Sequence, residues 1–301
     1  MTDANTAETK STEERTMYAV TGATGRLGGL VITALLRTLP AAQIAALVRT
    51  PAKASPLAEK GIAVREADYN RPETLRPALA GVDRLLLIAS SDLGHRVPQH
   101  KAVIDAATAV GVKLIVYTSV LRADTSRLAV AEEHRQTEAL LKASGVPFAL
   151  LRNGWYTENY TFSLPTVLEQ GAILGSTGEG RIASAARADY AEAAAAVFAA
   201  QADVKGRIYE LAGDEAFTMA ELAAEITRQS GTNVVYKDLP EADYKAALVR
   251  SGLPDSYAAS FARSSAVASH GELFDDTHQL SKLIGRPTTS LKDTIASALK
   301  P

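Results

Sequence analysis

Cysteine is absent from the 301-residue chain. This absence excludes disulfides, thiolate metal sites and a cysteine nucleophile, and it suits a reducing compartment, for which we expect the cytoplasm. No stretch of about 18 residues is apolar and free of charge, so no membrane span is predicted. The net charge is only −2, which gives no reason to expect nucleic-acid binding. None of the five histidines has the spacing of metal ligands, so no metal is expected.

The composition is that of a globular protein, with 47% apolar and 22% charged residues. A chain of this length suffices for one large domain, or for a domain with a smaller annex. Residues 1–16 are polar, carry six charges from Asp3 to Arg15 and have no apolar run. They are therefore predicted to form a disordered tail rather than a secretory signal.

From Met17 onward, short apolar runs alternate with longer amphipathic stretches. A continuous apolar run of four or five residues is typical of a buried parallel strand, because helices cover both faces of the sheet. The expected strands are Tyr18–Thr21, Ile44–Val48, Ile62–Val64, Leu85–Ala89, Leu114–Thr118 and Phe148–Leu151. The helices between them are expected over Gly29–Leu39, Pro72–Leu79, Val97–Val110 and Val130–Ser144. This alternation predicts an α/β fold with a doubly wound parallel sheet of the Rossmann kind.

After Arg152 the rhythm changes. Residues 153–182 are rich in glycine and are expected to be loop with one short helix, whereas the chain from Thr218 is mostly helical. We therefore predict a dinucleotide-binding domain of residues 17–152 plus about 183–213. A smaller, mostly helical substrate-binding lobe is predicted from about 153–182 plus 214–301. Asp189 with Glu192, and Thr218 with Glu221, have the spacing of helix capping boxes.

A glycine-rich turn lies at the first strand–helix junction. Its spacing is Gly-x-x-Gly-x-x-Gly, and its residues are Gly22, Ala23, Thr24, Gly25, Arg26, Leu27 and Gly28. Glycine allows the backbone to approach a pyrophosphate closely, and the amides at the helix start then face the phosphates. The alternative is a purely structural turn. Its place in the α/β pattern favours dinucleotide binding.

The residue that ends the second strand indicates which dinucleotide. An NAD site usually has an acidic residue there, about 20 residues beyond the turn, whereas this chain has Arg49. A guanidinium pairs with a 2′-phosphate, and Lys53 adds a second cation. NADPH is therefore the expected cofactor. The alternative is that Arg49 is merely a solvated strand end.

Polar and small residues follow the next strands. Asp68 is placed to lie beside the adenine, or else to cap a loop. The fourth strand ends in Ala89, Ser90 and Ser91, and the fifth strand includes Thr118. Ligands of doubly wound sheets cross the carboxyl ends of the strands, so these residues are candidates for contacts to the ribose and nicotinamide. Ordinary strand ends are equally consistent with them.

Several stretches together resemble the NmrA-like family of atypical short-chain dehydrogenases. They are TGATGRLGG, VRTPAKA, YTS at Tyr117–Ser119 and LRNGWYTENY at Leu151–Tyr160. Within that family, the stretches FDD at Phe274–Asp276 and LSKLIG at Leu280–Gly285 are especially similar to those of quinone reductases. The next most similar members are triphenylmethane dye reductases. The resemblance implies NADPH on the glycine turn and Arg49. It also implies a quinone in a cleft lined by Asn153, Gly154, Trp155 and Tyr156, which we name the acceptor residues.

The chain departs from ordinary short-chain dehydrogenases in one respect. Their Tyr-x-x-x-Lys pair is replaced here by Val130 and His134. The usual proton donor for carbonyl reduction is therefore missing, but a quinone accepts hydride readily and its hydroquinone anion takes a proton from water. His134 is a candidate proton relay, since the ordinary pKa of histidine lies near neutrality. The alternatives for His134 are a helix residue that bonds to the ribose and a surface residue.

These observations predict a flavin-free, metal-free NADPH-dependent quinone reductase, in which Asn153 orients the acceptor and His134 is a second candidate for catalysis. Two alternatives stay open. One is a redox sensor that binds dinucleotide without turnover, and the other is a reductase of triphenylmethane-type dyes. A homodimer is also compatible with the sequence.

Overall fold

The computed structural model describes residues 16–300, and of the tail predicted over residues 1–16 all but Thr16 lies outside this range. Seven strands within it form one parallel sheet in the order β3-β2-β1-β4-β5-β6-β8. Their bounds are β1 Tyr18–Thr21, β2 Ile44–Val48, β3 Ala63–Glu66, β4 Arg84–Leu87, β5 Leu114–Val120, β6 Phe148–Asn153 and β8 Ile208–Leu211. The order turns back at β1 and β4, so the predicted doubly wound sheet is confirmed.

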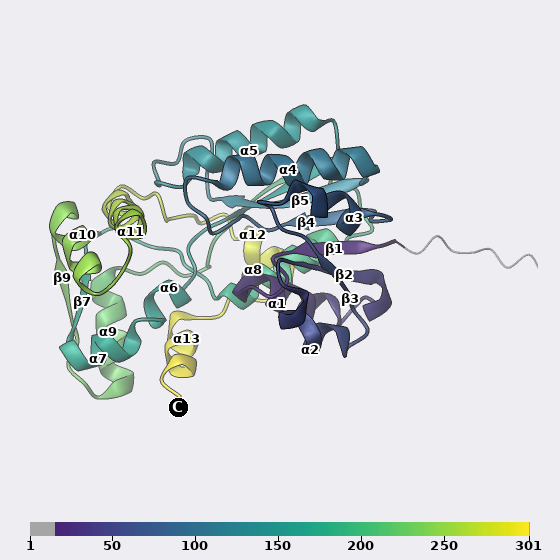
Figure 1. The fold of residues 1–301 in the computed structure, drawn as a ribbon. Helices are drawn as coiled ribbons and strands as arrows, with labels where there is room; N and C mark the ends of the chain where they lie inside the picture. The colour runs from purple at the N-terminus through teal and green to yellow at the C-terminus, as the bar shows by residue number, and fades with distance from the viewer. Residues whose placement is uncertain (1–15, 301) are drawn as a thin grey trace, which may run out of the picture.

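Helices cover both faces of this sheet, as Figure 1 shows. One face carries α1 (Arg26–Leu35), α8 (Arg187–Phe198) and α12 (Gln279–Ile284), and the other carries α3 (Leu75–Leu79), α4 (Arg96–Val110) and α5 (Ala131–Ser144). Short pieces are η1 (Ala41–Gln43), η2 (Pro51–Ala54), α2 (Ser55–Ala58) and η3 (Pro72–Thr74). The apolar strands are therefore buried between two helical layers, each with its own cluster of buried side chains.

A second lobe lies beyond the carboxyl ends of the strands (Figure 1). It contains α6 (Glu158–Thr161), α7 (Leu164–Gln170), α9 (Met219–Ser230), α10 (Glu241–Arg250), α11 (Asp255–Ala268) and α13 (Leu291–Ala298). Strands β7 (Ala172–Gly175) and β9 (Val235–Asp238) pair in parallel within it. The expectation that residues 153–182 are loop with one short helix was wrong, because they form two short helices and β7. The strand that pairs with β7 lies about 60 residues further along the chain, so no local sequence pattern predicts this pairing.

Two strands extend further than their apolar runs. β5 continues through Ser119 and Val120, and β6 continues through Arg152 and Asn153. Asn153 is therefore the last residue of β6 rather than a residue just beyond it. All four residues are buried, because the two strands remain paired to their ends.

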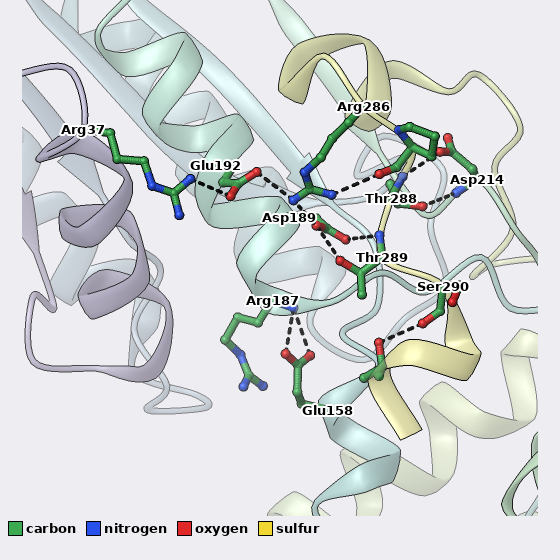
Figure 2. A network of polar contacts seen from close by, with 12 residues as sticks. Arg37, Glu158, Arg187, Asp189, Glu192, Asp214, Arg286, Thr288, Thr289 and Ser290 are labelled. Carbon is green, nitrogen blue, oxygen red and sulfur yellow. Dashed lines mark hydrogen bonds and ion pairs between the residues drawn. The ribbon is translucent and has the colours of Figure 1, made fainter. Parts of the chain in front are cut away.

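The chain returns from the second lobe to the large sheet and crosses back again. α12 packs against α8 and β8, and the crossing segment, residues 285–290, then leads into α13, which packs against α9. Asp189 on α8 anchors the crossing segment, as Figure 2 shows: its carboxylate accepts hydrogen bonds from Arg286 Nη2 at 2.8 Å and from the Thr289 backbone N–H at 2.7 Å. Asp189 is completely buried.

The two predicted capping boxes have different outcomes. The Thr218–Glu221 box is confirmed at the start of α9. The Asp189–Glu192 box was wrong, because α8 begins two residues earlier, at Arg187. Its first N–H is capped from outside the helix by the carboxylate of Glu158, at 2.9 Å (Figure 2). Asp189 is thereby left to hold the crossing segment.

Candidate active site

The glycine-rich turn joins β1 to α1 and depends on glycine at two positions. Gly22 has a φ of +57°, in the left-handed region that favours glycine. A Cβ on Gly28 would lie 2.3 Å from the carbonyl oxygen of Gly22, so α1 packs against the turn only without a side chain there. The Gly25 N–H donates to the Gly22 oxygen at 2.8 Å and closes the turn.

The first amides of α1 are available to a ligand. The backbone N–H groups of Arg26, Leu27 and Gly28 donate to no acceptor among residues 16–300, and no side chain caps the helix. Gly25 and Arg26 are exposed. Free amides at the positive end of a helix dipole are suited to a diphosphate. The turn therefore fits the pyrophosphate of a dinucleotide.

Two exposed cations follow β2. Neither Arg49 nor Lys53 forms an ion pair within the described part of the chain. Arg49 lies close enough to Tyr69 for its charge to oppose the rise in the pKa of Tyr69 that burial causes. The Tyr69 hydroxyl donates to the carbonyl of Ile88 at 3.2 Å, beyond the end of β4. Tyr69 was not predicted as a site residue, and it connects the Arg49 region to the point where the strand order reverses.

Asp68 serves a local turn in this structure. Its carboxylate accepts a hydrogen bond from the Asn70 N–H at 2.9 Å, and its own N–H donates to Thr74 Oγ1 at 3.0 Å. Asp68 therefore caps a loop, which is the alternative to the adenine contact that the sequence also allows. The predicted contact of Asp68 with the adenine stays a prediction.

The residues after β4 are fixed by side chains from neighbouring elements. Thr118 Oγ1 accepts from the Ala89 N–H at 2.8 Å, and His100 Nε2 accepts from the Ser90 N–H at 2.9 Å. Ser91 is exposed, and its carbonyl accepts from the Tyr257 hydroxyl of the second lobe at 3.0 Å. The predicted nicotinamide-side residues Ala89, Ser90, Ser91 and Thr118 therefore come together at one place on the carboxyl edge.

His134 is buried behind this edge. Its Nδ1 lies 2.7 Å from the Tyr117 hydroxyl, and its Nε2 lies 3.4 Å from Arg96 Nη1. Arginine only donates, so Nε2 is an acceptor and the proton of the neutral ring lies on Nδ1. Burial, and then the charge of Arg96, hold the pKa of His134 well below its usual range. His134 is therefore neutral near pH 7 and has no imidazolium proton to give.

Asn153 presents its side chain at the end of β6. Nδ2 donates to the Tyr156 hydroxyl at 3.4 Å, whereas Oδ1 is buried and has no donor in residues 16–300. The Tyr156 ring packs between Arg187, whose Cζ lies 4.8 Å from its centroid, and Tyr190. At Gly154 a Cβ would lie 2.9 Å from the Leu211 carbonyl oxygen, so β6 and β8 approach closely there.

Trp155 diverges from the other acceptor residues. It packs edge-on against Phe261 of α11, with centroids 6.0 Å apart, and lines a cavity of about 390 Å³ in the second lobe. Asn153, Gly154 and Tyr156 do not line that cavity. The structure therefore does not place all four acceptor residues around one space.

Sequence reasoning also missed an ionic cluster around the buried Arg152, the residue before Asn153. Arg152 bonds to Glu138, Asp124 and Glu210 at 2.7–3.0 Å, and Glu138 accepts from Ser119 Oγ at 2.5 Å. These hydrogen bonds to carboxylates raise the pKa of Arg152 against the opposing effect of burial. The only signal in the sequence is a charged residue at the end of an apolar strand run. The cluster fixes the backbone from which the Asn153 side chain projects.

Comparison with known proteins identifies the class. The sequence matches the NmrA-like family over residues 14–297, and the chain belongs to this family. Quinone oxidoreductase 2 of Escherichia coli (strain K12) is 56% identical over 280 residues, 93% of this chain and 98% of that protein. A crystal structure of the NADPH-dependent quinone oxidoreductase of E. coli complexed with NADPH matches with a TM-score of 0.92. Its identity is 55%, and the match covers 94% of this chain and 100% of that one.

A second solved relative is the Citrobacter sp. triphenylmethane reductase complexed with NADP(H). It matches with a TM-score of 0.89 at 39% identity, over 94% of this chain and 100% of that one. The predicted resemblance to the NmrA-like family is therefore confirmed.

In residues 16–300 no helix combines the length and apolar character needed to cross a bilayer, and no three acidic or imidazole side chains are grouped as metal ligands.

Proposed function

We propose that this protein is an NADPH-dependent quinone reductase. The likeness of nearly the whole chain to quinone oxidoreductase 2 of E. coli carries the proposal. The glycine turn with its free amides and the polar carboxyl edge of the sheet agree with it. When bound, NADPH supplies a hydride, which is two electrons and a proton, and a second proton from water completes the hydroquinone.

The cofactor is held by residues already described. The amides of Arg26, Leu27 and Gly28 bind the pyrophosphate, and Arg49 and Lys53 pair with the 2′-phosphate. Charge-assisted hydrogen bonds to a phosphate are stronger than neutral ones, so Arg49 favours NADPH over NADH. The nicotinamide half lies along Ala89, Ser90, Ser91 and Thr118, with Asp68 on the adenine side.

Asn153 orients the acceptor at the end of β6. Its Nδ2 group can donate to a quinone oxygen as negative charge develops there, and its unpaired Oδ1 can accept from the hydroquinone O–H that forms. Holding the ring against the nicotinamide supplies most of the rate, because a quinone needs no enforced proton donor. Gly154 and Tyr156 shape the wall beside it, and Trp155 closes the wall toward the second lobe.

His134 acts in this proposal as a positioning residue rather than a proton donor. Its neutral ring ties Tyr117 of β5 to Arg96 of α4, behind the edge that holds the nicotinamide half. The loss of the Tyr-x-x-x-Lys pair therefore leaves no side-chain acid at this place. The second proton comes from solvent.

The test is the loss of nicotinamide absorbance when the purified protein receives NADPH and a simple benzoquinone. Turnover is the expected result. Tight NADPH binding without turnover on any quinone or dye would favour the redox sensor, and turnover restricted to triphenylmethane dyes would favour the dye reductase. The dye reductase is retained as an alternative because the NADP(H)-bound triphenylmethane reductase of Citrobacter sp. is 39% identical to this chain.

Three finer predictions remain part of the proposal. The proposed substrate lobe consists of about 153–182 plus 214–301, apart from α12, which returns to pack on α8 and β8, and limited proteolysis tests this division. The cytoplasm is the proposed compartment, because a chain without cysteine suits a reducing environment. A homodimer is proposed as the assembly, and the mass in solution decides it.

A further inference from the structure

The second lobe contains a cavity that the sheet-edge chemistry does not use. Its volume is about 390 Å³, within the range of sites for small molecules. Buried or half-buried side chains from six elements form its walls, among them Val167, Ile173, Leu222, Ile226, Tyr244 and Phe261. We name this space the second-lobe cavity. These side chains give it a largely apolar wall that suits a hydrocarbon group.

The polar groups of the cavity lie at its rim and along part of its wall. Exposed residues at its rim include Ser163, Thr166 and Arg250, and no carboxylate lines the cavity. Thr177 and Ser265 of the wall are hydrogen-bonded to each other at 2.9 Å. At the inner wall, the buried indole N–H of Trp155 lies beside the Tyr160 hydroxyl and opposes, as a donor to it, the rise in the pKa of Tyr160 that burial causes. The two residues therefore supply each other's polar partner, and the occupant of the cavity is free to be a hydrocarbon group.

Trp155 connects this cavity to the proposed acceptor site. It follows Asn153, the last residue of β6, by two residues, and its side chain turns into the cavity while that of Asn153 stays at the strand end. A ligand that touches both has a polar ring at Asn153 and an apolar extension beyond Trp155. This arrangement rests on the proposed quinone reduction and makes the substrate more specific.

We propose that the second-lobe cavity binds the apolar side chain of the quinone, so that the preferred acceptors are quinones with a hydrocarbon tail. The ring stays beside Asn153, and the tail passes Trp155 and fills the space between α7, α9, α10 and β7. The tail takes no part in the hydride transfer. It lowers the KM of the acceptor by removing apolar surface from water.

The kinetic test compares one benzoquinone ring with and without a decyl chain. We expect the decyl quinone to have a kcat/KM about tenfold higher or more, because each buried methylene group strengthens binding. Ala247 of α10 lines the cavity and is half-buried, so Ala247→Phe fills it and should bring the ratio near one. Ala246→Phe is the matched control, because Ala246 is exposed on the same helix and does not line the cavity. An equal ratio in both variants, or no decyl advantage in the wild type, would overturn the proposal.

A binding test gives a readout that does not depend on turnover. Trp155 is the only tryptophan of the chain, so protein fluorescence reports directly on the cavity wall. Farnesol, a prenyl alcohol with a hydroxyl oxygen and no absorbing ring, should shift the emission in a saturable way in the wild type and in Ala246→Phe. The shift should be lost in Ala247→Phe.

The two tests separate this proposal from the proposed function. Reduction of the ring-only quinone without any decyl advantage would sustain quinone reduction and reject the tail site. No reduction of any quinone, together with saturable farnesol binding that Ala247→Phe removes, would reject the reductase and keep an apolar ligand site. No farnesol shift in the wild type would count against the cavity as a tail site in either case.

Discussion

The guanidinium of Arg26 lies over the ring of Phe162, with Cζ 5.0 Å from the ring centroid. Arg26 belongs to the glycine turn, whereas Phe162 follows α6 in the second lobe, so the contact spans the two parts of the molecule. Phe162 is 72% exposed, which is unusual for a large apolar side chain. Because Arg26 belongs to the turn that we propose as the pyrophosphate site, Phe162 is placed to assist cofactor binding.

We expect Phe162→Ala to weaken NADPH binding by about two- to fivefold. Exposed cation–π contacts contribute about 0.5–1 kcal/mol, which corresponds to this factor. The measurement is the Kd of NADPH by titration. Phe162→Tyr should restore wild-type affinity because it keeps an aromatic face, and a Kd unchanged by Phe162→Ala would show that the contact does not assist binding.

Arg49 should determine the choice of cofactor. Its charge-assisted bonds to the 2′-phosphate contribute about 1.5–3 kcal/mol, so NADPH should be preferred over NADH by about ten- to a hundredfold. Arg49→Asp should reverse the preference, because a carboxylate repels the phosphate and accepts from the ribose 2′-OH. Salt should reduce the wild-type preference, since Arg49 is exposed.

The measurement is KM for both cofactors in the wild type and in the variant. Lys60→Asp makes the same change of charge before the amino-terminal end of β3, whereas Arg49 follows the carboxyl-terminal end of β2, and it should leave the ratio unchanged. Equal use of NADPH and NADH by the wild type would show that Arg49 is not the selector.

Much of this architecture is predictable from the sequence, because buried parallel strands have continuous apolar runs and the turn has a fixed glycine spacing. The end of β6 is different. Arg152 breaks the apolar run, and only its tertiary bonds to Glu138, Asp124 and Glu210 allow the strand to continue to Asn153. Those partners come from two other elements and a loop, so no local pattern contains them.

The acceptor residues show a second limit of sequence reasoning. Asn153 and Trp155 are two residues apart, and their sequence alone suggests one shared pocket. The structure separates them, because Trp155 packs against Phe261, more than 100 positions further along the chain. The composition of a loop identifies candidate residues, whereas the elements packed around the loop decide where each side chain points.

Asn153 and His134 should respond differently to substitution. Asn153→Ala should lower kcat by about a hundredfold, since single hydrogen bonds to developing charge contribute on that scale, and should leave the Kd of NADPH nearly unchanged.

His134→Gln should change kcat by less than about tenfold, well below the cost of removing a general acid, because the neutral ring has no proton to give. A fall of several orders of magnitude in His134→Gln, with a flattened pH profile near neutrality, would instead identify a proton relay.

His100 should make the fold sensitive to acid. Burial, and then the charge of Arg96, lower the pKa of His100 from 6.5 to about 3. Below pH 6.5 the unfolded chain takes up a proton that the folded chain does not, so the free energy of unfolding falls as pH drops toward 3 and is unaffected by this group above pH 6.5. The loss is about 1.4 kcal/mol per pH unit, or about 2 kcal/mol between pH 7 and pH 5.

Urea unfolding of the wild type and of His100→Gln at several pH values measures this contribution. The variant should be less stable at pH 7, because the bond to Ser90 N–H is altered, but its stability should decline less steeply between pH 6.5 and pH 5. Parallel curves for the two proteins would show that His100 does not titrate in this way.

Asp189 should be the most sensitive position of the crossing segment. Its fully buried carboxylate accepts from Arg286 Nη2, from Thr289 N–H and from Thr289 Oγ1 at 3.0 Å (Figure 2). In Asp189→Asn the side-chain NH2 group faces one of these donors, and Arg286 loses its buried counter-charge. Arg286 is partly exposed and keeps Glu192 as a partner, so the main cost is a buried donor left without its acceptor, about 1–3 kcal/mol, and the urea midpoint should fall clearly. Glu192→Gln removes the partly exposed carboxylate that also pairs with Arg286 at 2.7 Å, and should cost less than about 1 kcal/mol. Similar losses for both variants would mean that total charge around Arg286, rather than the buried anchor at Asp189, holds the crossing segment in place.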